Sequence, residues 1–120
     1  MSEAIQGGVK FRAADVEATE YLPNKGVFLG GMLGRSRGDG FGLYFGRIQP
    51  GSEISREVHP EATETVFVLS GKAIGIVGEQ EIPLAAGEVL HVHRNVPHGI
   101  RNAGSETLEI LVIGNPDFGA

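Results

Sequence analysis

The sequence predicts an all-β fold of the sandwich or barrel class, and three observations support this prediction. Short apolar runs rich in β-branched residues recur roughly every 8–12 residues along the chain. The 19 glycines and 6 prolines fall mostly between these runs, where turns are needed. No stretch of about ten residues shows the 3.6-residue apolar period of an amphipathic helix. Eight or more short strands in a single domain of this length suit a double-sheet jelly roll.

The expected strands follow one another with short turns between them. Two short apolar runs on either side of Gly30-Gly31 come first, and a polar turn over residues 35–40 leads to a strand rich in aromatic residues. Pro83 lies in a later run and cannot donate a backbone hydrogen bond, so that strand is expected at a sheet edge or a bulge. In chain order the expected strands are residues 27–29, 32–33, 41–48, 65–69, 72–77, 82–84, 89–92 and 107–113.

The first 25 residues have the least regular pattern. Residues 16–22 are compatible with a short strand or a helical turn, and the following Pro23-Asn24-Lys25-Gly26 is typical of a turn. We therefore divide the chain into an N-terminal arm, residues 1–25, and a β-barrel, residues 26–120. The arm is expected to pack on its own barrel or on a neighbouring subunit.

Composition excludes several classes of function. The chain has no cysteine, which rules out disulfides, cysteine-ligated zinc and a thiol nucleophile. Its formal net charge is −5, so no positive field attracts nucleic acid. No apolar run approaches the ~20 residues of a membrane span. The N-terminus has neither the basic region nor the apolar block of a secretory signal, so we expect a soluble cytoplasmic protein without nucleic-acid or membrane partners.

Histidine is the residue type most informative about function. All four histidines lie between positions 59 and 98. Glu57 and His59 are two residues apart, so in a strand their side chains face the same side. A turn after His59 can return Glu64 beside it, while His98 follows another turn and can open a further strand. Two imidazole nitrogens and two carboxylate oxygens form a ligand set for a divalent metal.

Two segments resemble the paired motifs of the cupin superfamily. The first is Gly51-x5-Glu57-x-His59-x4-Glu64-x6-Gly71, which resembles the pattern G-x5-HxH-x3,4-E-x6-G. The second is Gly87-x5-His93-x-Asn95-x2-His98-x3-Asn102, which resembles G-x5-PxG-x2-H-x3-N. The motifs are 15 residues apart, an interval normal for a small cupin. The resemblance covers about residues 40–114 and implies a single-domain jelly-roll barrel, also described as a double-stranded β-helix.

The resemblance also implies a metal centre. Carried over residue by residue, the ligands of the family fall on Glu57, His59, Glu64 and His98, which would hold one divalent ion (Fe, Mn, Ni or Zn) per subunit. Glu57 stands where the family usually has histidine. Its carboxylate is either a fourth ligand or a general base beside a three-ligand site.

The second motif departs from the family at two positions. His93 and Asn95 replace the usual proline and glycine, and asparagine tolerates the positive φ that the turn needs. His91 and His93 share a strand face. If that face points inward they are proton-transfer or substrate-binding groups, and if it points outward they are surface or dimer residues. His93 is thus a candidate catalytic residue together with Glu57, and Asn102 is expected to tie down its loop.

The resemblance leaves several functions open, because cupins host many chemistries. We expect a metal-dependent enzyme that acts on a small organic molecule in the barrel cavity, with isomerase, lyase, cyclase or dioxygenase chemistry. The alternatives are a non-catalytic module that binds or senses a small molecule, and a barrel that has lost its metal. Small cupins often pair through strands and an N-terminal arm, so the resemblance further implies a homodimer.

Overall fold

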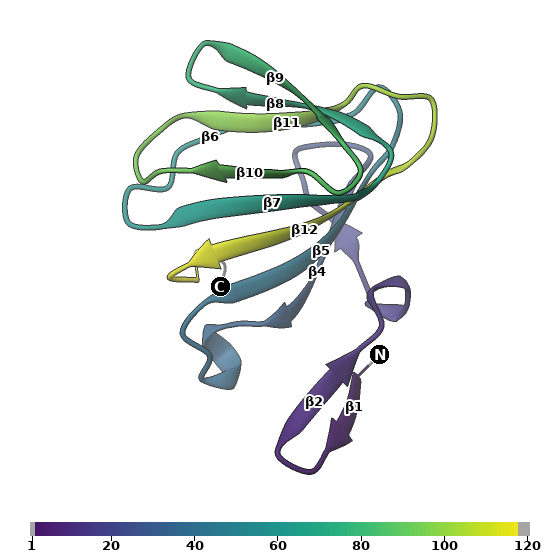
Figure 1. The fold of residues 1–120 in the computed structure, drawn as a ribbon, viewed down its shortest axis with the longest axis vertical. Helices are drawn as coiled ribbons and strands as arrows, with labels where there is room; N and C mark the ends of the chain where they lie inside the picture. The colour runs from purple at the N-terminus through teal and green to yellow at the C-terminus, as the bar shows by residue number, and fades with distance from the viewer. Residues whose placement is uncertain (1, 118–120) are drawn as a thin grey trace.

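The computed structural model describes residues 2–117 and confirms the all-β jelly roll (Figure 1). In this part of the chain the strands are β1 (Ser2–Ile5), β2 (Gly8–Phe11), β3 (Thr19–Glu20), β4 (Val27–Leu33), β5 (Gly42–Ile48), β6 (Glu53–Glu57), β7 (Thr63–Ser70), β8 (Lys72–Val77), β9 (Gln80–Ala85), β10 (Val89–Val92), β11 (His98–Asn102) and β12 (Leu108–Asn115).

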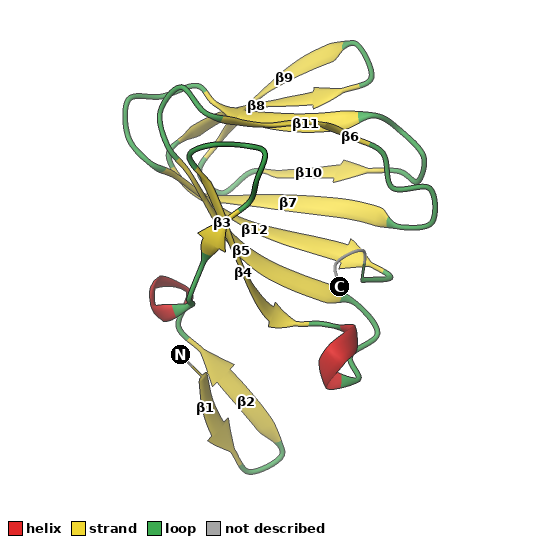
Figure 2. Cartoon of the chain, turned by 180° about the vertical axis from the view of Figure 1, so that it is seen from behind, coloured by secondary structure: helices red, strands yellow, loops and turns green. Residues whose placement is uncertain are grey.

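Two antiparallel sheets form the barrel (Figure 2). The larger sheet has the strand order β10-β7-β12-β5-β4-β3, and the smaller has the order β6-β11-β8-β9. Chain neighbours such as β6 and β7 lie in different sheets, so the chain crosses between the sheets repeatedly. The sequence motifs are therefore brought together from both sheets.

The core between the sheets follows from the alternation of side chains along each strand. In β12, Leu108, Ile110 and Val112 are buried, while the residues between them are half-buried. Because successive side chains point to opposite faces, these three all face the smaller sheet. Ile48 and Val68, on the strands that flank β12, belong to the same apolar cluster. Fully burying one such side chain stabilises the fold by roughly 1.5–3 kcal/mol.

Helical structure in residues 2–117 is limited to two single 3₁₀ turns, Ala13–Asp15 and Arg35–Arg37. Neither has the length or the apolar character that a membrane-crossing helix requires.

The strand predictions hold for most of the barrel, with one correction at Gly30-Gly31. The runs on either side of this pair form one continuous strand, β4. A Cβ atom on Gly30 would lie 2.5 Å from the backbone oxygen of Glu17, so the glycine admits a crossing segment of chain. Pro83 lies in β9, which is an edge strand of the smaller sheet, as predicted.

The first 25 residues divide into two parts. Strands β1 and β2 form a separate hairpin that extends away from the barrel, with no buried residue (Figure 1). The second part packs on the barrel: Val16 is buried, and β3 pairs with β4. The contact of the arm with a second subunit stays a prediction.

Candidate metal centre

The candidate ligands lie where the two sheets approach each other at one end of the barrel. Glu57 is the last residue of β6 and His98 the first residue of β11, and their Cα atoms are paired across the smaller sheet. Cross-strand partners share a face, so both side chains point toward the larger sheet. Glu64 enters from that sheet, near the start of β7. His98 opens β11, as the sequence predicts, and Glu64 lies one residue into β7 after the predicted turn.

His59 reaches the same point from a loop. β6 ends at Glu57, so the expectation that both residues lie in one strand is wrong. The loop is held by the second motif, since the backbone N–H of Asn95 donates to the His59 carbonyl oxygen at 3.0 Å. Asn95 has φ 64°, the left-handed conformation that the sequence predicted for it. The two motifs therefore meet directly, and this contact places the imidazole of His59 beside Glu57 and Glu64.

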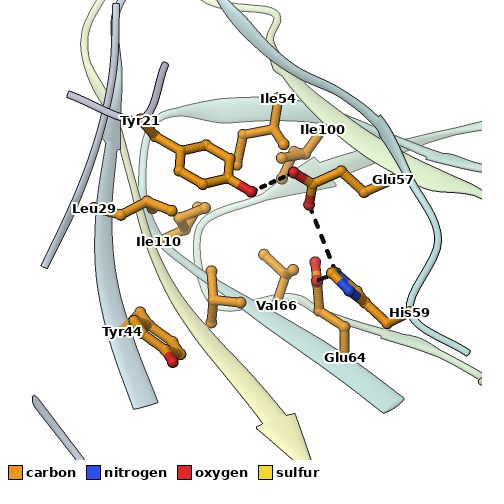
Figure 3. Close-up of a pocket in the computed structure, with 11 residues that line it drawn as sticks. Tyr21, Leu29, Tyr44, Ile54, Glu57, His59, Glu64, Val66, Ile100 and Ile110 are labelled. Atoms are coloured by element: carbon orange, nitrogen blue, oxygen red, sulfur yellow. Dashed lines mark hydrogen bonds and ion pairs between the residues drawn. The ribbon is translucent and has the colours of Figure 1, made fainter. Parts of the chain in front are cut away.

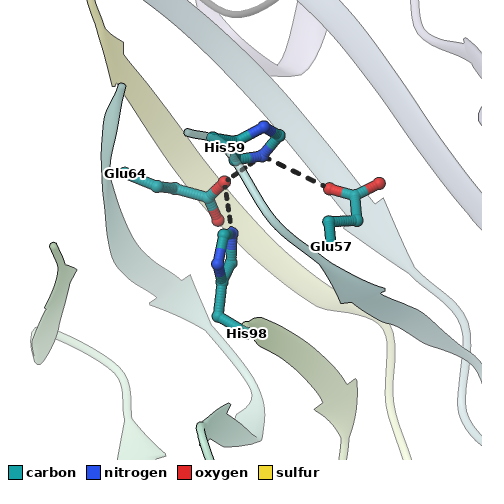
Figure 4. Close-up of side chains that lie close together, drawn as sticks. All are labelled: Glu57, His59, Glu64 and His98. Carbon is teal, nitrogen blue, oxygen red and sulfur yellow. Dashed lines mark hydrogen bonds and ion pairs between the residues drawn. The ribbon is translucent and has the colours of Figure 1, made fainter. Parts of the chain in front are cut away.

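Four donor atoms converge at this end of the barrel (Figure 4), all within 4.8 Å of one another. His59 Nε2 lies 3.6 Å from Glu57 Oε1 and 3.3 Å from Glu64 Oε1. His98 Nε2 lies 3.1 Å from the same Glu64 oxygen. Two ligands each ~2.1 Å from one ion are ~3.0 Å apart at a right angle and ~3.4 Å apart at the tetrahedral angle. The spacing and the nitrogen and oxygen donors therefore fit a divalent cation.

The second ring nitrogen of His98 fixes the orientation of the imidazole. Its Nδ1–H donates to the carbonyl oxygen of Val96 at 2.8 Å, which turns Nε2 toward Glu64. Ligating histidines commonly have such a backbone partner. Because His98 is buried, with only 6 % of its side chain exposed, this orientation is fixed by the surrounding packing.

The protonation of the cluster reflects its close contacts. Burial by itself would raise the pKa of Glu64, but hydrogen bonds from His59 and His98 outweigh burial and lower that pKa. Burial likewise would lower the pKa of His98, but the hydrogen bonds to Glu64 and to the Val96 carbonyl raise it. Without a cation the centre is therefore held by the Glu64 carboxylate facing the imidazole of His98, which tends toward the charged form. A divalent cation would take the place of that imidazole proton.

A cavity of about 260 Å³ opens beside the cluster (Figure 3). Its polar end is formed by Glu57, His59 and Glu64, and the aromatic rings of Tyr21 and Tyr44 line its sides. The rest of the wall is aliphatic and consists of Leu29, Ile54, Val66, Ile100, Ile110 and Val112. The cavity thus suits a small ligand with a polar end and an apolar body.

Tyr21 is a site residue that the sequence analysis missed. Its hydroxyl donates to Glu57 Oε2, on the side of the carboxylate away from His59 (Figure 3). Burial raises the pKa of Tyr21, and the hydrogen bond to Glu57 raises it further, so the hydroxyl stays protonated. Tyr21 follows β3 in the segment assigned to the N-terminal arm. The pairing of β3 with β4 and the backbone hydrogen bond from Tyr21 to Val27 bring it to the cavity. The sequence indicated the turn between them but left residues 16–22 open between a strand and a helical turn.

His91 and His93 lie outside the site. Both are exposed, their ring centroids are 5.7 Å apart, and neither lines the cavity. Register explains the difference: His91 pairs with Thr65 on the outer face, while the next residue, Val92, pairs with Glu64 and is buried. The structure does not bring His93 to Glu57, so we assign it no catalytic role.

Asn102 ties down its loop, as predicted. Its side-chain amide donates to the carbonyl oxygens of Ile48 and Glu106, each at 2.8 Å. Its side-chain oxygen accepts the backbone N–H of Gly104 at 2.8 Å. The hydrogen-bonding groups of this buried amide are thus used to join β11 to the turn before β12.

Comparisons with known proteins agree with this architecture. Residues 44–114 match the model of the cupin domain family. An uncharacterized protein of Streptomyces coelicolor is 34% identical over 106 residues, which cover 88% of this chain and 94% of the relative. A crystal structure described as a predicted oxalate decarboxylase from Thermotoga maritima superposes with a TM-score of 0.79 at 20% identity, covering 88% of this chain and 96% of the other.

A second solved structure, the polyketide cyclase RemF from Streptomyces resistomycificus, superposes with a TM-score of 0.75 at 19% identity. The superposition covers 88% of this chain and 77% of the cyclase chain. At such identities the two solved structures show a shared fold. The matched family model spans both motifs, the strands it covers form the two-sheet jelly roll, and the motif residues converge on one centre. On these grounds the chain belongs to the cupin family.

Proposed function

We propose that this protein is a metal-dependent enzyme that acts on a small organic molecule in the barrel cavity. The observation that supports the proposal is the convergence of four nitrogen and oxygen donors at the polar end of an otherwise apolar cavity. Glu57, His59, Glu64 and His98 would hold one divalent ion of the Fe, Mn, Ni or Zn type. When bound, such an ion supplies a Lewis acid for a carbonyl or carboxylate oxygen of the ligand.

The chain itself supplies an acid–base pair beside that centre. Glu57 Oε1 faces His59, while Oε2 accepts the hydroxyl of Tyr21. We propose that Glu57 accepts and returns a proton at Oε2, and that Tyr21 holds this oxygen toward the cavity. The raised pKa of Tyr21 keeps its hydroxyl a donor across the physiological range. Proton movement next to a polarised carbonyl serves isomerase, lyase and cyclase chemistry.

Metal content tests the first half of the proposal. Protein purified without added metal is incubated with Mn(II), Fe(II), Ni(II) or Zn(II), desalted, and measured by elemental analysis. We expect about one ion per chain for at least one of these metals. A content near zero after every incubation would contradict the metal centre and would favour a barrel that works without metal.

Deuterium exchange tests the second half. Metal-loaded protein is incubated in D₂O with a panel of small 2-oxo acids and diketones, and exchange of the C–H next to the carbonyl is followed by NMR. We expect protein-dependent exchange for a subset of the panel, and its loss in Glu57→Gln. The matched control is Glu61→Gln, which removes an exposed carboxylate from the neighbouring loop. Equal exchange in the two variants would remove Glu57 from the chemistry.

A non-catalytic binding module is the second candidate. Both tyrosine hydroxyls of the cavity are engaged by carboxylates, Tyr21 with Glu57 and Tyr44 with Asp117. Apart from the polar end and the two tyrosines, the side chains of the cavity wall are aliphatic and have no reactive group, so they contribute only to the fit of a ligand. Saturable binding of panel members, measured by calorimetry and accompanied by no exchange and no turnover, would favour this candidate.

We also propose a homodimer. The hairpin β1–β2 has no buried residue and extends from the barrel, and an isolated two-stranded hairpin has little stability of its own. Sizing chromatography with light scattering at micromolar concentration is expected to give twice the mass of one chain. A variant lacking residues 2–11 is expected to shift toward the monomer, and a full-length chain that elutes as a monomer would contradict the proposal.

A further inference from the structure

The charges at the polar end of the cavity restrict the ligands that can bind there. Glu57 and Glu64 meet at the candidate metal centre, and their two negative charges balance the +2 charge of one divalent ion. His59 and His98 bind a metal as neutral imidazoles. The assembled centre therefore has no net charge. The balance is the same whether Glu57 ligates the ion or stands beside it as a base.

The cavity wall adds no positive charge. Among the described residues that line it there is no lysine and no arginine. The hydroxyls of Tyr21 and Tyr44 are uncharged and already donate to carboxylates. The aliphatic part of the wall offers no hydrogen-bond donor to an incoming anion. A charge that enters this space without a partner carries a large desolvation cost.

The arginines on the other side of His59 do not change the balance. A second hollow there is lined by His59 together with Arg35, Glu61 and Asp117. The guanidinium of Arg35 donates to the backbone oxygen of Asp117 at 2.6 Å. Two carboxylates and one guanidinium line this hollow, and the guanidinium of Arg94 donates to the backbone oxygen of Glu61 beside it, so the hollow has no net positive charge. An anion therefore gains no positive field from either side of the centre.

We infer that the cavity takes a neutral or singly charged small molecule with an oxygen-donor end and an apolar body, and that it disfavours small dianions such as oxalate. The inference rests on the proposed metal centre and adds the class of ligand. A neutral centre accommodates one negative charge at most, through the ion itself, and a second charge has no partner. An apolar body increases binding affinity, because its burial against the aliphatic wall removes apolar surface from water.

Three probes that share adjacent oxygen donors test the inference: oxalate with two negative charges, oxamate with one, and N-butyloxamate with one and an apolar tail. Their dissociation constants are measured by calorimetry on Mn(II)-loaded protein. In the wild type we expect N-butyloxamate to bind at least about tenfold tighter than oxamate, since the butyl tail buries apolar surface against the aliphatic wall. We also expect N-butyloxamate to bind tighter than oxalate.

Variants isolate the effect of charge. Glu57→Gln removes one negative charge from the centre and preserves the shape of the side chain. We expect its oxalate-to-oxamate affinity ratio to rise at least about tenfold, because like charges a few ångströms apart in a protein interact by several kcal/mol. Glu61→Gln removes the same charge from the hollow beyond His59, outside the cavity. Its ratio should stay within about twofold of the wild type.

Elemental analysis of the same samples separates the two levels of the proposal. If no sample holds Mn(II), nor Fe(II), Ni(II) or Zn(II) loaded in its place, the proposed metal centre fails and the inference fails with it. If Mn(II) is bound and the ratio is unchanged in Glu57→Gln, or the butyl tail adds no affinity, only the inference is overturned. If Glu57→Gln alone releases Mn(II), the wild type decides: oxalate binding tighter than N-butyloxamate would overturn the inference.

Discussion

The four histidines form two pairs that look alike in sequence and differ completely in environment. His59 and His98 are largely buried, and both approach one oxygen of Glu64. His91 and His93 are exposed on the outer face near β10, where the partner of His91 is the hydroxyl of Thr65 at 2.8 Å. We call them the inner pair and the outer pair. The comparison teaches that the register of β7, with Glu64 facing in and Thr65 facing out, decides which histidines can meet a metal.

Removing each pair is the strongest test of this comparison. We expect the double variant His59→Ala/His98→Ala to lose all bound metal, because two of the four donors disappear. The matched variant His91→Ala/His93→Ala should keep about one ion per chain. Elemental analysis after equal metal loading gives both values. Stoichiometric metal in the inner-pair variant would show that the ion binds elsewhere. Loss of metal in the outer-pair variant would show that the outer pair also contributes to metal binding.

Removing the side chain that each pair contacts sharpens the comparison between the pairs. Glu64→Gln removes the carboxylate that both inner histidines approach, and its side chain is only 13 % exposed. We expect the metal-free protein to lose about 3 kcal/mol of unfolding free energy, the usual scale for breaking a buried charged pair. Metal affinity should fall at least ~10-fold. Denaturant unfolding and metal titration measure these effects.

Thr65→Ala is the control, since it removes the partner of the outer His91. It should change stability by less than about 1 kcal/mol and leave metal affinity unchanged. Similar stability losses in Thr65→Ala and Glu64→Gln would mean that the inner pair contributes no more than a surface contact.

The same contrast explains how far the sequence could predict this protein. The strands around the motifs, the starts of β7 and β11, and the left-handed Asn95 follow from local patterns of apolar residues and turns. Spacing also predicted the convergence of Glu57, His59, Glu64 and His98. The strands and turns follow from a residue and its chain neighbours, whereas the meeting of His98 with the first motif followed from the resemblance to the paired cupin motifs.

Features that depend on distant partners were not accessible from local patterns. Residues of the outer pair share a face with each other, but which face is inward depends on the pairing of β10 with β7. The reach of Tyr21 into the cavity depends on β3 joining β4. The continuity of β4 through Gly30 depends on the crossing backbone at Glu17. In each case the outcome depends on a contact between two segments that are separate in the chain.

The next largest effect is the pH dependence of the unfolding free energy of the metal-free protein, to which the inner pair contributes. A raised histidine pKa, as for His98, gives stability that is complete below the ordinary value of 6.5 and is lost as pH rises through the folded-state pKa. The lowered pKa of Glu64 gives stability that is complete above the ordinary value of 4.5 and is lost as pH falls through its folded-state pKa. The inner cluster therefore stabilises the metal-free protein most between pH 4.5 and 6.5.

Stabilisation by bound metal should have the opposite pH dependence from stabilisation by protonated His98. Protons compete with the ion for His98, so affinity should fall by up to about tenfold for each pH unit below the raised pKa of that residue. Thermal unfolding of chelator-treated and metal-loaded protein across pH measures this, and the increase in Tm from metal should grow with pH. The outer-pair variant should follow the wild-type profile. A Tm increase that is independent of pH would exclude His98 as a ligand.

The smallest expected effect asks whether the inner centre depends on residues beyond its donors. Tyr21→Phe removes only the hydroxyl that holds Glu57 Oε2, and the ring still fills the cavity wall. Because one oxygen of one candidate ligand loses its partner, we expect metal affinity to fall by about tenfold, the low end of such effects. Tyr44→Phe is matched to it, since that hydroxyl donates to Asp117 rather than to a candidate ligand. It should cost about 1 kcal/mol of stability and leave metal affinity unchanged. Equal metal affinities in the two variants would show that Tyr21 shapes the cavity without positioning Glu57, and the acid–base pair would then reduce to Glu57 alone.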